Sequence, residues 1–165
     1  MDNIKNDSQI ELTNMLQDKD DSNAFAKTKE IASESELSDK YYSCIKDFAT
    51  LLNSEKSYIR TRAFILICSQ ARWDVKGSIK GILPSMLELF HDPKPTVVRQ
   101  CLNAIQEVIA FRPELCGAIN AELKKIDLSA YKDSMSPLIQ KDISEVQNLI
   151  SEVIPCENSG ELKND

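Results

Sequence analysis

The sequence is poor in glycine, histidine and aromatic residues. Its 165 residues include 4 Gly and 1 His, and the aromatic fraction is 6%. So few glycines leave little material for phosphate-binding loops or for the tight turns of a β-meander. A single histidine excludes a metal centre built from several imidazoles and leaves one candidate for a histidine-dependent triad. The sequence therefore predicts a protein that is not an enzyme.

Closely spaced cysteines and long apolar runs are also missing. The five cysteines are Cys44, Cys68, Cys101, Cys116 and Cys156. None forms a CxxC pair, which argues against a zinc or iron–sulfur site built by local spacing, and we expect Cys68, Cys101 and Cys116 to be buried thiols. No apolar run approaches the ~18 residues of a membrane span, and residues 1–7 lack the apolar core of a signal peptide. We predict a cytoplasmic protein without metal, cofactor or membrane contact.

Basic residues are fewer than acidic ones, but the excess of acid is uneven. The formal net charge is -6. Residues 1–36 hold nine acids and four bases, residues 37–154 fourteen acids and fifteen bases, and residues 155–165 three acids and one base. Coating nucleic acid needs a concentrated basic face, so nucleic acid is a disfavoured partner. The nearly neutral middle can still carry a local basic patch.

Helix-forming sequence is plentiful, and it recurs. Hydrophobic residues are 42% of the chain and charged residues 28%, enough for one folded domain rich in helix formers. Ser57, Thr96 and Ser136 each precede an apolar run of helical period, at spacings of 39 and 40 residues, and Ser22 gives a weaker copy 35 residues before Ser57. We predict that these hydroxyl residues cap the helices that follow them.

A second amphipathic stretch and a polar turn precede each of these helix starts. The stretches are residues 10–16, 41–52, 79–90 and 115–126. A two-helix unit of this size cannot bury its apolar stripe alone, so neighbouring units must stack. The sequence therefore predicts an all-α solenoid of four helix-turn-helix units over residues 8–154, between a flexible N-terminus (1–7) and a flexible tail (155–165).

Residues 83–105 resemble a HEAT repeat. They carry Pro84 in the first helix, Asp92-Pro93 at the turn and Val98-Arg99 at the start of the second helix. The preceding unit is similar, with Ile59-Arg60 in the Val-Arg position. This resemblance implies a HEAT-like α-α superhelix whose second helices line the concave side.

A narrower resemblance covers roughly residues 8–154. Segments 57–62, 71–74 and 131–142 look like those of short HEAT-repeat proteins from Firmicutes-type bacteria, some of which carry a SufBD-like label. The resemblance implies a scaffold without established catalytic residues.

Three arginines lie near the starts of the predicted second helices. Arg60 and Arg99 each follow a proposed cap by three residues, and Arg62 lies two residues further on. A cation in an exposed first turn faces the positive end of the helix dipole, at a cost of about 0.3 to 1 kcal/mol. In one interpretation, polar turn residues seven positions earlier, Asn53 and Asp92, form a ladder with Arg60 and Arg99 that ties adjacent units. In the other, the arginines bind an anionic partner.

The second interpretation defines a candidate partner-binding surface. Its residues are Arg60, Arg62, Trp73, Lys94, Arg99, Gln100, Tyr131, Lys132 and Lys141. Trp73 and Tyr131 have an alternative role in packing. We predict a non-enzymatic scaffold that binds an acidic or phosphorylated protein segment on its second-helix face. The alternatives are a nucleic-acid-binding module related to HEAT-like DNA alkylation-repair glycosylases, and an accessory of iron–sulfur assembly.

Overall fold

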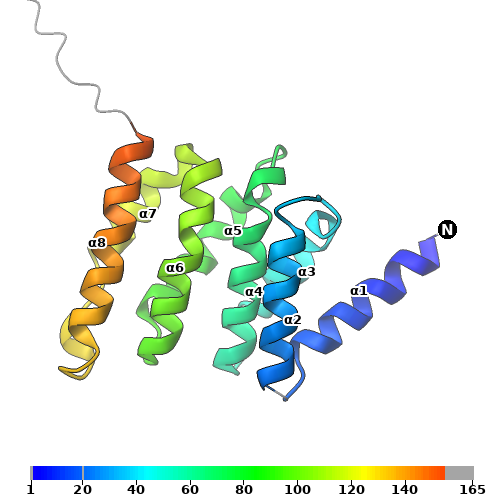
Figure 1. Cartoon of the computed structure of the whole chain (residues 1–165), viewed down its shortest axis with the longest axis horizontal. Coiled ribbons are helices and arrows are strands. Elements are labelled where there is room, and N and C mark those ends of the chain that lie inside the picture. The colour runs from blue at the N-terminus through cyan, green and yellow to red at the C-terminus, as the bar shows by residue number, and fades with distance from the viewer. Residues whose placement is uncertain (1, 20, 155–165) are drawn as a thin grey trace, which may run out of the picture.

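The structure is a computed structural model that describes residues 2–19 and 21–154 (Figure 1). These residues form helices and no strand, which confirms the all-α prediction. The α-helices are α1 (Asp2–Leu16), α2 (Asp21–Glu34), α3 (Ile45–Leu51), α4 (Ser57–Ser69), α5 (Ser78–Leu87), α6 (Pro95–Phe111), α7 (Cys116–Leu123) and α8 (Ser136–Val153). Short 3-10 helices are Tyr42–Cys44, Ala71–Trp73, Glu88–His91, Pro113–Leu115 and Leu128–Ala130.

The limits of the helical region differ from the sequence-based boundaries at one end. Helix α1 includes residues 2–7, which the sequence assigned to a flexible N-terminus. The tail predicted at 155–165 lies outside the described residues. Among the helices of the described segments, none combines the length and the apolarity needed to span a bilayer.

The helices form two rows. Helices α2, α4, α6 and α8 lie side by side in sequence order, while α3, α5 and α7 lie behind them (Figure 1). Helix α4 contacts α2, α3 and α6, and nine of its 13 residues are buried. A helix buried on nearly all sides is stabilised by its neighbours more than by its own propensity, since each buried Leu, Ile or Phe side chain contributes about 1.5 to 3 kcal/mol.

The predicted helix starts are correct to within two residues, but the predicted capping is wrong. Ser57 and Ser136 are the first residues of α4 and α8, and no side-chain hydrogen bond caps α4, α6 or α8. The serine hydroxyls have other partners. The Ser57 Oγ accepts from the Lys94 Nζ at 2.8 Å, and the Ser136 Oγ donates to the Leu128 carbonyl at 2.8 Å.

A buried aspartate caps α5 instead. Both carboxylate oxygens of Asp74 accept backbone N–H groups, from Ser78 at 2.8 Å and Ile79 at 3.0 Å, and the Tyr42 hydroxyl donates to the same carboxylate at 2.6 Å. Gly77 lies between them at φ 74, a left-handed conformation that glycine adopts without a steric penalty.

The last helix buries one side and exposes the other. Ile139, Ile143, Val146 and Ile150 of α8 are buried against the helices before it. The opposite side exposes polar residues, namely Gln140, Lys141, Glu145, Asn148, Ser151 and Glu152. This division is that of an amphipathic helix at the edge of a row.

The buried cysteines should resist thiol reagents while the protein is folded. Cys44, Cys68, Cys101 and Cys116 are free and buried, and burial raises the pKa of the Cys68 and Cys101 thiols well above the ordinary value. Because the thiolate is the reactive form, we expect no labelling of a Cys156→Ser variant by a disulfide reagent at mildly alkaline pH until denaturant is added.

A cysteine placed at the exposed Asn148 of this variant provides the control and should react at once. Rapid native-state labelling of Cys68 or Cys101, identified by peptide mapping, would show that α4 and α6 are not packed as described.

Candidate interaction groove

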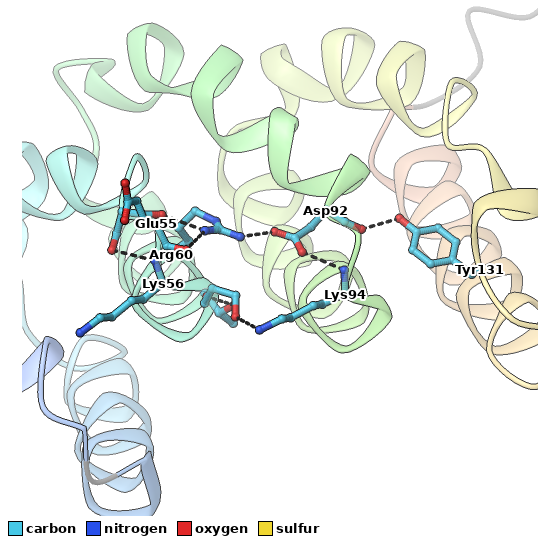
Figure 2. A network of polar contacts seen from close by, with 9 residues as sticks. Glu55, Lys56, Arg60, Asp92, Lys94 and Tyr131 are labelled. Atoms are coloured by element: carbon cyan, nitrogen blue, oxygen red, sulfur yellow. Dashed lines mark hydrogen bonds and ion pairs between the residues drawn. The ribbon is translucent and has the colours of Figure 1, made fainter.

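The Arg60 side chain joins two consecutive helix pairs. Its Nη2 donates to the Asp92 Oδ2 at 2.6 Å, and its Nη1 donates to the Ser54 carbonyl at 2.8 Å (Figure 2). The predicted pairing of Arg60 with Asn53 in its own turn is therefore wrong in register, because Asn53 is exposed and the acid comes from the following turn.

Asp92 is the centre of this network. Its side chain is 4% exposed, and its Oδ1 accepts the Lys94 backbone N–H at 2.9 Å while its carbonyl accepts the Tyr131 hydroxyl at 2.7 Å (Figure 2). Tyr131 is half-buried and packs against the core, so its hydroxyl acts as a tether. A single aspartate thus connects α4, the start of α6 and the segment that precedes α8.

The other two arginines also have partners within the protein. The Arg99 Nε and Nη2 donate to the two carboxylate oxygens of Asp142 on α8, at 2.6 and 3.3 Å, in the fork geometry favoured by guanidinium groups. Arg62 is 1% exposed, and its Nη1 donates to the carbonyls of Leu16 and Asp18 at 2.8 and 3.0 Å. Arg62 therefore fixes the turn between α1 and α2 against α4.

The remaining sequence-predicted residues are dispersed. The Trp73 Nε1 donates to the Ser35 carbonyl at 2.7 Å. This hydrogen bond joins the Ala71–Trp73 3-10 helix to the segment that follows α2. Lys132 and Lys141 are exposed, and the Lys141 Nζ lies 3.9 Å from the Glu145 carboxylate. Lys94 and Gln100 are exposed on the same hollowed surface of α6. The structure thus brings together only part of the predicted set.

A groove of about 680 Å³ crosses α2, α4 and α6. Its lining residues are Phe25, Lys29, Ala32, Glu36, Ile65, Cys68, Ser69, Thr96, Arg99, Gln100, Asn103, Ala104, Gln106, Glu107 and Met135. We call this hollow the second-helix groove. Its apolar floor comes from Phe25, Ile65 and Ala104, which belong to three consecutive second helices.

A smaller hollow continues the groove toward the first turns of α4 and α6. It is lined by Ser22, Phe25, Ser57, Tyr58, Thr61, Arg62, Lys94, Thr96, Val97 and Gln100. We call it the lysine-end hollow. It shares Phe25, Thr96 and Gln100 with the second-helix groove, so the two hollows form one continuous surface. The charged residues among its described lining are Arg62 and Lys94, both basic.

Amide side chains line one edge of the groove. Gln100, Asn103 and Gln106 recur at three-residue steps along α6 and line the second-helix groove together. None of the three makes a side-chain hydrogen bond to another described residue. Each amide offers donor and acceptor groups, the same pair that a peptide unit offers. Sequence reasoning missed Asn103 and Gln106, although their spacing was a visible signal.

The described segments contain no group of three or more His, Cys, Asp or Glu side chains placed to hold a metal ion. His91, the single histidine, lies at the surface with its Nε2 2.6 Å from a carboxylate oxygen of Glu122.

Comparison of the chain with models of protein families, with curated proteins and with solved structures found no match.

Proposed function

We propose that this chain is a non-enzymatic, cytoplasmic protein-interaction scaffold of the HEAT-repeat type, and that it binds a partner protein in the second-helix groove. The single observation that carries the proposal is the groove itself. Three consecutive second helices contribute to its floor, and the amides at its edge have no partner within the described residues. Concave surfaces with an apolar floor and a few convergent polar groups are the usual form of binding sites.

The long-range polar contacts support the repeat architecture in this proposal. The pairs Arg60–Asp92, Lys94–Ser57, Trp73–Ser35, Tyr131–Asp92 and Arg99–Asp142 are separated by 32, 37, 38, 39 and 43 residues. Each separation is close to one two-helix unit, so the contacts join neighbouring units. Stability that depends on nearest-neighbour interfaces is the property of a solenoid.

The arrangement of charges bears on the alternatives. Arg60, Arg62 and Arg99 all donate to acceptors of the protein itself, which leaves them poorly placed to neutralise nucleic-acid phosphates. The four buried cysteines make no metal cluster with other described residues. No observation on the structure favours the glycosylase-related or the iron–sulfur alternative over the scaffold.

Site-specific photocrosslinking in the native host provides a direct test of the groove. With benzoylphenylalanine in place of Asn103, we expect ultraviolet light to attach a discrete partner protein, because this position lies on the groove wall. The partner would be identified by mass spectrometry of the affinity-purified adduct.

Asn148 on α8 is the matched control, since it is an exposed asparagine outside the groove. The adduct from position 103 should disappear when Gln100→Trp fills the groove, and position 148 should give no such adduct. The proposal would be contradicted if positions 103 and 148 gave the same adduct in equal yield, or if Gln100→Trp left the yield of the adduct from position 103 unchanged.

A further inference from the structure

The positive charge of the composite groove is concentrated at the lysine end. Among the described residues that line the lysine-end hollow, the charged ones are Arg62 and Lys94. The second-helix groove is mixed in charge, since Glu36 and Glu107 line it together with Lys29 and Arg99, and Glu107 is paired with Arg72 at 3.0 Å. The macrodipoles of α4 and α6 add positive potential at the lysine end, because the amino ends of both helices lie there. An occupant is thus favoured if its negative group lies at the lysine end.

Lys94 is the cation best placed to meet that group. It is exposed, its Nζ donates to the Ser57 hydroxyl at 2.8 Å, and it takes part in no ion pair with another described residue. A lysine whose described side-chain partner is a neutral hydroxyl can bind a carboxylate or phosphate without breaking an existing ion pair. Arg62, by comparison, is already hydrogen-bonded to backbone carbonyls.

The row of amides indicates the conformation of the occupant. A helical segment satisfies its own peptide groups internally and requires mainly an apolar trough. An extended segment leaves peptide N–H and C=O groups to be satisfied by the binding surface. The Gln100, Asn103 and Gln106 amides supply donors and acceptors of that kind beside the floor formed by Ile65 and Ala104. The groove is therefore better suited to an extended segment.

The length of α6 sets the spacing within that segment. Lys94 and Ala104 are ten residues apart in sequence, which corresponds to about 15 Å along a helix. An extended chain advances about 3.3 Å per residue, so it covers this span in about four or five residues. The acidic group and the apolar side chain that reaches the floor should have this separation.

From these observations we propose that the groove binds an extended peptide segment with an acidic residue at the Lys94 end and a medium-sized apolar residue about four or five positions away. This inference rests on the proposed function, since it specifies the partner of the same groove. The recognition elements are the Lys94 ammonium group, the α6 amides and the floor at Ile65 and Ala104.

A library of phage-displayed random dodecapeptides, selected on the full-length protein, tests this specificity. The double variant Gln100→Trp/Asn103→Trp serves for counter-selection, because it fills the groove at two exposed positions. We expect the enriched peptides to share Asp or Glu at about four or five residues from Leu, Ile, Met or Phe. Peptides with N-methylated backbone between these two residues should bind more weakly.

Charge reversal at Lys94 measures the electrostatic part. In fluorescence anisotropy with a labelled enriched peptide, Lys94→Glu should weaken binding about five- to tenfold, with a smaller difference at high salt. Lys46→Glu is the matched control, since Lys46 is an exposed lysine near the start of α3 and outside both hollows, and its effect should stay within about twofold.

The possible failures are distinct. One result would overturn this inference and leave the groove as a binding site. In it, the enriched peptides bind only the open groove, lack the acidic residue, and bind the Lys94→Glu variant with unchanged affinity. If counter-selection left no enriched peptide, because every peptide that bound the wild type also bound the Gln100→Trp/Asn103→Trp variant, both this inference and the proposed function would be overturned.

Discussion

Replacing Arg62 with methionine is expected to lower the free energy of unfolding by about 3 kcal/mol. The guanidinium group of this 1%-exposed side chain donates to the carbonyls of Leu16 and Asp18. Methionine retains much of the aliphatic stem but supplies no donor, so the Leu16 carbonyl at the end of α1 and the Asp18 carbonyl in the following turn lose this partner. Urea denaturation followed by circular dichroism would measure the change.

Arg99→Met is the appropriate comparison, because the Arg99 side chain is 37% exposed and its removal leaves Asp142 accessible to water. Its cost should be about 1 kcal/mol or less. If Arg62→Met cost no more than Arg99→Met, the buried role of Arg62 would be disproved. For the same structural reason, Arg60→Glu combined with Arg62→Glu would report on folding and could not serve as a test of partner recognition.

Removing the Asp92 carboxylate should have a comparable effect. Asp92→Ala deprives the Arg60 guanidinium and the Lys94 backbone N–H of their acceptor in a site where the Asp92 side chain is only 4% exposed, so we expect a loss of about 3 kcal/mol. Thermal or urea unfolding of the single variant gives the total cost.

A double-mutant cycle separates the ion pair from the rest of this cost. Arg60→Ala, Asp92→Ala and the double variant should show a coupling energy of about 1 to 3 kcal/mol. Glu55→Ala, an exposed acid beside the same turn, should change stability by less than about 0.5 kcal/mol. Additive effects of Arg60→Ala and Asp92→Ala would contradict the tie between α4 and the turn before α6.

The helices were predictable because their signal is local. The apolar positions of residues 41–52 and 79–90 recur at helical steps, and helices occur in both segments. Helix starts near Ser57 and Ser136 followed from the same periodicity. The capping prediction failed because a serine hydroxyl can bond to any nearby acceptor or donor, and the Leu128 carbonyl and the Lys94 ammonium group come from elsewhere in the chain.

The partners of the arginines could not be read from the sequence. Spacing within one unit pointed to Asn53 as the partner of Arg60, whereas the acid in contact is Asp92, 32 residues later. The pairing depends on the offset between adjacent helix pairs along their axes, which is set by tertiary packing. The groove could not be predicted for a related reason. Phe25 and Ile65 each belong to an apolar pattern of helical period, as core residues do, and only the packing of the helices shows that they line a hollow.

The two-sided character of α8 bears on how copies of this protein meet. Its four buried apolar residues pack against the rest of the fold, and the solvent-exposed side carries Lys141, Glu145 and Glu152. Another molecule that packed against this side would have to remove water from these charged groups, of which Lys141 and Glu145 are 3.9 Å apart. Head-to-tail filaments built through that helix are consequently disfavoured, and crowded solutions should remain free of fibres nucleated at this edge.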